Sequence, residues 1–414
     1  MNHARIAVVQ FPGANCERET HMALKRVGLE GCDVYWNQTG INFDHYAGFI
    51  IIGGFSYEDR GRAGLIAAQD TIMQKIKIQA AKGKPVLGIC NGAQILIESG
   101  MLIDDKHAIA LTDNMRLLKA KPLGNGYYND WVYIKPESNK NEGCFHPINL
   151  KQPIYLPIAH AEGRFVMAKN TLDYLMTNGA TLWRYCDASG KCDDAFPINP
   201  NGSVYNLAGI TNAAGNILAL MPHPERTTNG DILFSCMKDY ILASKPCKKA
   251  TKLTPKPSIT PRMQHFSSAA HSLVFVIQSQ ITDDAAISLQ KVLKSRGYEV
   301  PLTRYRFIEI VGQNDQIKQQ YSELCQTGEL YNPNKETLVT PELEDNMFLV
   351  RPNDDLKGLM LTRTLRDCYG FSGIDHIETG LIWCVDTKDS KDPNLLPYCK
   401  TLLHHPLTSQ CLLF

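Results

Sequence analysis

A cysteine stands between two glycines at the end of an apolar run, in residues 85–94. The run predicts a buried strand and the residues after Cys90 predict a helix, so the thiol lies at a strand-to-helix turn. Unpaired N–H groups and the positive end of the dipole at a helix start favour thiolate over thiol. Gly88 and Gly92 let the chain turn sharply without a blocking side chain. The segment predicts a cysteine nucleophile, with a buried structural cysteine as the alternative.

A histidine flanked by prolines follows a second apolar run, residues 215–221. The prolines stiffen the backbone around His223. Glu225, two residues on, lies on the same side of an extended segment and can hold the far ring nitrogen of the imidazole. Cys90, His223 and Glu225 therefore predict a triad of nucleophile, proton shuttle and orienting carboxylate. Without the cysteine turn, the histidine segment would be interpreted as a surface loop.

The triad segments resemble the class I (triad-type) glutamine amidotransferases, and further segments resemble the glutaminase subunit of phosphoribosylformylglycinamidine synthase. These further segments are residues 11–16, 53–59, 158–165, 201–203 and 208–210. They follow the family's order across residues 1–243, and several motifs in a shared order are a stronger sign than any one motif. The resemblance implies an α/β fold with a mostly parallel sheet flanked by helices, flavodoxin-like in type.

The resemblance also implies a role for each motif residue. Cys90 would attack the side-chain amide of glutamine to give a thioester, and His223 would protonate the leaving amine and then activate water. The oxyanion would be held by the backbone N–H groups of Gly54 and Asn91. The substrate-binding candidates are Gly53, Gln94 and Ser56.

Three residues within these motifs lie outside the set of catalytic and binding candidates: Glu58, His160 and Glu162. Glu58 stands where the family usually has glycine, which puts the backbone course of that loop in doubt. His160 and Glu162 look like a second acid–histidine pair, and the family places this segment near the interface with the synthetase. They are not expected to be the catalytic pair, because the strand at 218–221 supplies the triad histidine better.

The alternation of strands and helices through residues 1–243 predicts a mostly parallel sheet covered on both faces. The expected strands are residues 6–9, 33–35, 48–52, 85–89 and 215–221, and the expected helices are residues 18–27, 67–82, 91–99 and 231–242. Because Cys90 follows a strand, the active site is expected at the carboxyl ends of the strands.

Composition excludes several function classes for this chain of 414 residues, which is long enough for two or three domains. Lysine and arginine number 43 against 42 for aspartate and glutamate, so no basic field suggests nucleic acid. No apolar run approaches the roughly eighteen residues of a membrane span, and no signal peptide precedes residues 6–9. The 13 cysteines predict free thiols, no metal site and a cytoplasmic protein.

The composition changes after residue 243. Residues 244–270 are rich in lysine and proline, which predicts an extended linker. Residues 271–335 and 345–414 each show a strand, a helix, a small aromatic-rich turn and a second strand, which predicts a smaller α+β region of two β-α-β repeats. Each repeat resembles the small bridging subunit of the same synthase, which pairs strand to strand with itself. An unrelated α+β domain is the alternative.

The sequence shows no Gly-x-x-x-x-Gly-Lys-[Ser/Thr] loop and no other clear phosphate cradle. No cofactor is therefore expected in this chain, and ATP and Mg are expected on a separate synthetase that converts formylglycinamide ribotide to its amidine. The isolated chain is expected to show negligible glutaminase activity. The repeats could pair with each other or with a second chain. A free-standing amidohydrolase and a non-catalytic scaffold of the same complex are the competing hypotheses.

Overall fold

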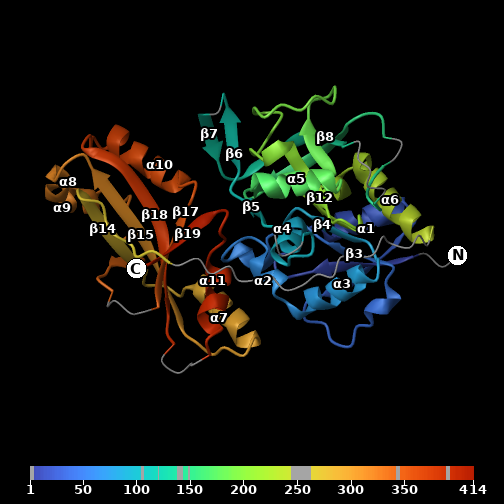
Figure 1. Cartoon of the computed structure of the whole chain (residues 1–414), viewed down its shortest axis with the longest axis horizontal. Coiled ribbons are helices and arrows are strands. Elements are labelled where there is room, and N and C mark those ends of the chain that lie inside the picture. Colours follow the sequence, from blue (N-terminus) through green and yellow to red (C-terminus); the bar gives the residue numbers. More distant parts are fainter. Residues whose placement is uncertain are drawn as a thin grey trace. The chain divides into compact units, whose positions relative to one another are not determined.

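The computed structural model describes residues 4–103, 107–119, 121–137, 143–147, 150–243, 263–341, 346–387 and 392–414. The chain divides into two units, Met1–Pro257 and Ser258–Phe414, and each is described by itself (Figure 1). Most of the predicted linker, residues 244–262, lies outside the described residues. Among the helices of the described part, none has both the length and the apolar character that crossing a membrane requires.

The N-terminal unit contains one large sheet, and the first half of this sheet is parallel, as the alternation of strands and helices predicts. Its strands are β1 (Arg5–Gln10), β2 (Glu30–Tyr35), β3 (Gly48–Ile51), β4 (Val86–Ile89) and β13 (Ile217–Leu220), in the order β2-β1-β3-β4-β13. Every neighbouring pair among them is parallel. Because β1, β3, β4 and β13 are almost wholly buried, they appear in the sequence as continuous apolar runs.

Helices pack against this half of the sheet. They are α1 (Glu17–Arg26), α2 (Leu65–Ala68), α3 (Thr71–Ala81), α4 (Asn91–Glu98) and α6 (Asp231–Leu242), with short 3-10 turns at η1 (Phe43–His45), η2 (Ser56–Asp59), η3 (Val204–Asn206), η4 (Pro224–Arg226) and η5 (Thr228–Gly230). The single helix predicted over residues 67–82 is two helices. Asp70 separates them, because its side chain accepts the N–H of Ile72 at 3.0 Å and caps α3.

The other half of the N-terminal unit continues the same sheet with antiparallel strands. Strands β12 (Leu207–Thr211), β11 (Trp183–Cys186), β8 (Tyr128–Pro136) and β9 (Ile154–His160) follow β13 in that order. The predicted α/β class is confirmed, and the nine-stranded sheet is mixed: parallel as far as β13 and antiparallel beyond it. The remaining elements are β5 (Ile109–Thr112), which pairs with β10 (Arg164–Met167), β6 (Met115–Leu118), which pairs with β7 (Lys121–Asn125), and α5 (Lys169–Thr177).

The C-terminal unit is one six-stranded antiparallel sheet built from two repeats. The first repeat contains β14 (Ser272–Ser279), α7 (Asp284–Ser295), β15 (Leu302–Gly312), α8 (Gln316–Gln319), α9 (Tyr321–Gln326) and β16 (Glu336–Leu338). The second contains β17 (Met347–Pro352), α10 (Leu356–Arg363), a π-helical turn (Thr364–Cys368), β18 (Ile374–Val385), α11 (Leu395–Leu403) and β19 (Ser409–Leu413). The strand order is β16-β14-β15-β18-β17-β19. From either edge inward, the third, first and second strands of one repeat follow each other, so the second strands of the two repeats meet at the centre.

Strands β15 and β18 join the repeats within this one chain. Their antiparallel register runs from Leu302 opposite Val385 to Gly312 opposite Ile374. Each repeat has the predicted β-α-β order, followed by a further helical segment and a third strand. The unit also begins before residue 271, where the linker was predicted to end, because the N–H of Phe266 donates to the carbonyl oxygen of Leu413 at 2.6 Å.

Candidate active site

Cys90 occupies a strained turn between β4 and α4, which we call the elbow. Its φ of 51° and ψ of −106° lie outside the regions that L-residues ordinarily adopt. Close packing fixes the turn. A Cβ on Gly92 would lie 2.0 Å from the carbonyl oxygen of Ile51, and one on Gly88 would lie 2.4 Å from that of Gly92. Both glycines are therefore needed for close backbone approach, and the thiol stands at the N-terminus of α4, as predicted.

His223 and Glu225 form the predicted pair just after β13. His223 Nδ1 lies 2.6 Å from Glu225 Oε1, and both side chains are almost fully buried. The backbone N–H of His223 donates to the carbonyl oxygen of Pro157 at 2.9 Å, so β9 holds this segment in place. The carboxylate fixes the proton on Nδ1 and leaves Nε2 for a reacting group.

Cys90 and His223 interact across the site. Burial alone would lower the pKa of His223, but the Glu225 carboxylate and the Cys90 sulfur outweigh burial, and the pKa is raised. The effect of Cys90 arises chiefly from its charge, and His223 Nε2 has no hydrogen-bond partner among the described residues. The Cys90 thiol also lies 3.7 Å from the carbonyl oxygen of Ala159 on β9. The structure thus brings the three predicted triad residues together, with the imidazole between a sulfur and a carboxylate.

A second cysteine approaches the other side of the imidazole. Cys16 Sγ lies 4.0 Å from His223 Nδ1, and Arg226 Nη2 donates to this sulfur at 3.2 Å. Cys16 therefore faces the ring nitrogen that Glu225 already engages, which favours Cys90 as the nucleophile. Cys16, His223 and Glu225 are close enough together to reach one metal ion. We do not assign them as ligands, because the guanidinium of Arg226 lies on the sulfur.

The predicted oxyanion donors are the N–H groups of Gly54, after β3, and Asn91, at the start of α4. The N–H of Asn15 donates to the carbonyl oxygen of Gly53 at 3.1 Å, and the N–H of Phe55 donates to that of Gly13 at 2.9 Å. The bridge between Ala14 and Gly54 therefore does not use the N–H of Gly54. The N–H of Asn91 begins α4 and has no acceptor within that helix. A Cβ on Gly54 would lie 2.5 Å from the carbonyl oxygen of Gly13, which explains the glycine there.

The three predicted substrate-binding residues all lie beside the triad or the elbow. Gly53 packs against the imidazole, since its Cβ would lie 2.9 Å from His223 Cε1. Ser56 is buried, and its hydroxyl has no partner among the described residues. Gln94 is buried as well, but its amide donates to the carbonyl oxygen of Glu162 at 2.7 Å and accepts from Asn91 Nδ2 at 2.8 Å. Ser56 therefore offers an available polar group, whereas the amide of Gln94 is engaged with the protein.

The loop after Gly54 stores backbone strain. Tyr57, Glu58 and Asp59 have φ values of 53°, 57° and 51°, a left-handed conformation that costs a non-glycine residue about 1–2 kcal/mol. This left-handed backbone conformation explains why the family usually has glycine where this chain has Glu58. The side chain of Asn91 holds the loop, because its Oδ1 accepts the N–H of Ser56 at 3.0 Å and its Nδ2 donates to Asp59 at 3.2 Å. Loop and elbow are thus joined through one residue.

Replacing Glu58 by glycine should raise the free energy of unfolding by about 0.5–1 kcal/mol. Relief of about 1–2 kcal/mol of strain exceeds the roughly 0.5–1 kcal/mol that glycine loses through its freer unfolded state. Chemical denaturation of the full chain measures the change. Glu58→Ala is the matched control, because it removes the exposed ion pair with Arg60 but keeps the strain. Equal stability of the two variants would contradict the strain argument.

His160 and Glu162 do not form the acid–histidine pair that their spacing suggested, and that prediction is wrong. His160 Nδ1 lies 3.1 Å from Asn114 Oδ1, and burial together with the nearby His223 lowers the pKa of His160 to about 3. Glu162 Oε2 accepts the N–H of Ala63 at 3.4 Å, and burial raises the pKa of Glu162 to about 7. Their placement near a partner interface stays a prediction.

The raised pKa of Glu162 predicts a pH-dependent stability. The folded chain binds this proton more tightly than the unfolded chain, whose pKa is near 4.5, so the stabilisation present below pH 4.5 is lost as the pH rises through about 7. Between pH 5.5 and 8, the wild type should lose about 2 kcal/mol more than Glu162→Gln. Denaturation at the two pH values measures this difference. Glu58→Gln, an exposed acid nearby, should follow the wild type; the same behaviour in Glu162→Gln would refute the assignment.

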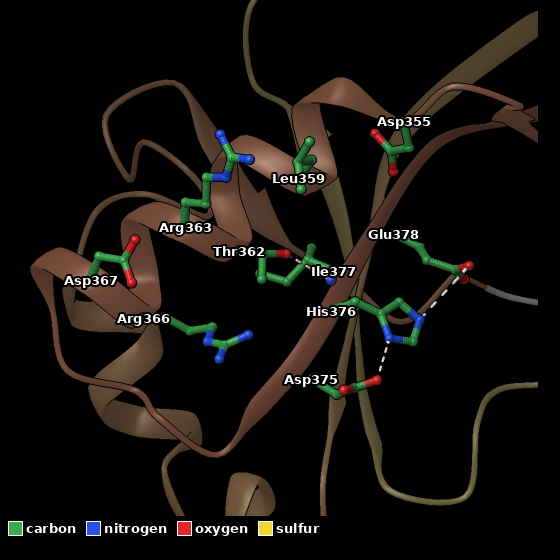
Figure 2. Close-up of a pocket in the computed structure, with 10 residues that line it drawn as sticks. All are labelled: Asp355, Leu359, Thr362, Arg363, Arg366, Asp367, Asp375, His376, Ile377 and Glu378. Atoms are coloured by element: carbon green, nitrogen blue, oxygen red, sulfur yellow. Dashed lines mark hydrogen bonds and ion pairs between the residues drawn. The ribbon is translucent and has the colours of Figure 1, made fainter. Parts of the chain in front are cut away.

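A pocket in the C-terminal unit has a volume of about 520 Å³ and lies between α10 and β18 (Figure 2). In Figure 2 the ring of His376 lies beside the carboxylates of Asp375 and Glu378, with Nδ1 2.8 Å from Asp375 and Nε2 4.0 Å from Glu378. Arg363 and Arg366 bring positive charge to the same lining. The lining contains no cysteine or serine, and the hydroxyl of Thr362 donates to the carbonyl oxygen of Gly358 at 2.7 Å, so the pocket offers no counterpart of Cys90 for the attack on an amide.

Comparison with known proteins gives consistent matches for the N-terminal unit. Residues 3–240 match the family described as CobB/CobQ-like glutamine amidotransferase domain. The phosphoribosylformylglycinamidine synthase subunit PurQ of Methanothrix thermoacetophila is 41% identical over 226 residues, which are 54% of this chain and 86% of the relative. PurQ of Methanocaldococcus jannaschii is 41% identical over 243 residues, 57% of this chain and 98% of the relative.

A solved structure of PurLQS from Thermotoga maritima contains a chain that is 31% identical to this one, with a TM-score of 0.46. The match covers 58% of this chain and 100% of that chain. The C-terminal unit lies outside the family match, which ends at residue 240.

Proposed function

The chain belongs to the glutamine amidotransferase family that includes the PurQ subunits, and from this premise we propose that it is the glutaminase component of phosphoribosylformylglycinamidine synthase. It hydrolyses glutamine and supplies ammonia to a separate synthetase. The observation that carries this function is the 2.6 Å contact of Glu225 with His223 Nδ1, which leaves the other ring nitrogen for Cys90.

The reaction follows from the positions of the triad and the two N–H groups. The Cys90 thiolate attacks the amide carbon of glutamine, and the N–H groups of Gly54 and Asn91 stabilise the oxyanion. His223 gives its Nε2 proton to the leaving nitrogen, the C–N bond breaks, and ammonia departs from a thioester. His223 then removes a proton from water, which attacks the thioester to release glutamate and Cys90. Glu225 stays ionised and holds the ring.

The partner and compartment follow from the chemistry of the product. Ammonia is mostly protonated in neutral water and is then not nucleophilic, so a synthetase must receive it directly. ATP and Mg²⁺ belong to that synthetase in this proposal, and the chain itself needs no cofactor. The isolated chain has negligible glutaminase activity and is activated by the ATP-loaded synthetase in the cytoplasm. The named relatives, which are subunits of a synthase, support this arrangement.

The C-terminal unit acts in this proposal as the bridge between glutaminase and synthetase. Two observations support the assignment: the resemblance of each repeat to the small bridging subunit, and the strand order that is the same from either edge. A pair of identical modules joined at their second strands would give that order. In this chain β15 and β18 form the junction, so one chain supplies the whole pair.

Cys90→Ala, mixed with the synthetase, should lose glutamine-dependent product formation by at least about 10³-fold, because no other group forms the thioester. Product formation from added ammonia should remain, since the synthetase is unchanged. The assay compares glutamine and ammonia as nitrogen donors with ATP and formylglycinamide ribotide. Cys236→Ala on α6 is the matched control and should behave as wild type. Undiminished use of glutamine by Cys90→Ala would support the scaffold hypothesis instead.

Thr303→Cys should form a disulfide with the native Cys384 on oxidation, because these residues stand opposite each other on β15 and β18. Within-chain pairing predicts a cross-linked monomer at every protein concentration, with glutamine-dependent activity of the complex retained. Non-reducing mass measurement and peptide mapping identify the product, and Cys384→Ala added to the variant removes it. Covalent dimers would show that the repeats pair between chains.

A further inference from the structure

Arg226 lies next to the triad, yet the reaction described above makes no use of its charge. Its Nε lies 3.8 Å from Glu225 Oε1, and its Nη2 donates to Cys16 Sγ at 3.2 Å. The side chain is one-third exposed, so most of the guanidinium is removed from solvent. An arginine whose role was only to solubilise this turn would not need a buried sulfur as its acceptor.

The sulfur of Cys16 is held in place as the acceptor for that guanidinium. It is fully buried at the N-terminus of α1, where its carbonyl oxygen accepts from the N–H of Thr20 at 3.1 Å and from the Thr20 hydroxyl at 2.7 Å. Its thiol donates to Asn15 Oδ1 at 3.2 Å while accepting from Arg226. The lack of a side chain at Gly53 makes room for the sulfur, since a Cβ there would lie 3.1 Å from it. Cys16 therefore has a fixed position.

The positive charge of Arg226 interacts electrostatically with the groups of the triad. Burial alone would lower the pKa of Arg226, but the hydrogen bond to Cys16 and the charges of Cys16, Glu225 and Cys90 raise it. Arg226 also lies 3.8 Å from the carboxylate that holds His223, so its positive charge stands next to the groups that exchange the proton. Arg226 thus acts on both members of the Cys90–His223 pair.

We propose that Arg226, held by Cys16, is a positioning residue that maintains the Cys90 thiolate and keeps the Glu225 carboxylate against His223. The inference rests on the proposed function, since it concerns the same triad. The titratable and charged groups in and around the triad come from several elements. They are Glu225 and Arg226 from η4, Cys16 from the start of α1, Cys90 from the elbow, His160 from β9 and Tyr185 from β11. Of these groups, Arg226 alone carries a fixed positive charge.

The sign of the expected pH effect follows from removing one positive charge. Without it, the Cys90 thiol gives up its proton less readily, and the His223 imidazolium retains its proton to a higher pH. In a plot of the reactivity of Cys90 against pH, both the acidic and the basic limb therefore move to higher pH. Arg226→Gln should shift the midpoint of the acidic limb upward by about half a pH unit or more, as expected for a charge within roughly 10 Å in a partly buried site.

The test is the rate of alkylation of the full-length chain by iodoacetamide between pH 5 and 10, with the modified cysteine located by peptide mass spectrometry. Arg226→Gln should show the upward shift, and Arg226→Lys, which keeps the charge, should show less than half of it. Cys16→Ala, which frees the guanidinium, should shift the profile in the same direction, and Cys16→Ser, which keeps an acceptor, should restore it. Cooperative unfolding of each variant shows that it is folded.

The outcomes separate this inference from the proposed function. Profiles of Arg226→Gln and Cys16→Ala that coincide with the wild type overturn the positioning role. If Arg226→Gln does not fold, the comparison of Cys16→Ala with Cys16→Ser decides: a shift reversed by serine supports the role, and equal profiles overturn it. Failure of Cys90 to be the fast-reacting cysteine in the wild type would instead refute the proposed function.

Discussion

The chemistry of the site depends on the hydrogen bond between Glu225 and His223. Because the carboxylate takes Nδ1 at 2.6 Å, one ring nitrogen remains for proton transfer, and only a group on that side of the ring can exchange a proton with it. This constraint distinguishes the two cysteines that approach the imidazole. Cys16 comes from the Nδ1 side, where the carboxylate already lies, whereas Cys90 stands on a turn whose backbone is fixed by close contact with β3.

The antiparallel half of the sheet has a direct part in positioning the site. Strand β9 is the last strand of the sheet, yet its carbonyl groups reach both catalytic segments: that of Pro157 accepts from the backbone of His223, and that of Ala159 lies near the Cys90 thiol. The parallel half presents the cysteine and the histidine at neighbouring strand ends and packs Gly53 against the imidazole, but the backbone N–H of His223 finds its acceptor only on β9. The antiparallel half of the sheet supplies these contacts through β9.

The elements that were predicted correctly are those whose signals are local. Buried parallel strands give continuous apolar runs, and the glycines around Cys90 mark the turn. The break at Asp70 was missed because it depends on one capping side chain, and β9 was missed because its contacts with the triad join residues far apart in the chain. His160 and Glu162 have the same spacing as His223 and Glu225, which suggested a second acid–histidine pair. Strand β9 ends at His160, so the chain turns and carries Glu162 to Ala63 instead.

The two repeats also show what joining them in one chain permits. Each repeat begins its first helix with an aspartate cap, Asp283 in the first and Asp355 in the second, which indicates a common plan. The remaining contacts differ: Asp283 pairs with Arg304 at 2.8 Å, whereas Asp355 accepts from the hydroxyl of Thr379 at 2.8 Å. In a dimer of identical chains, any such change would occur in both copies. Because β15 and β18 pair within one chain, each half can change separately, as the different contacts of Asp283 and Asp355 illustrate.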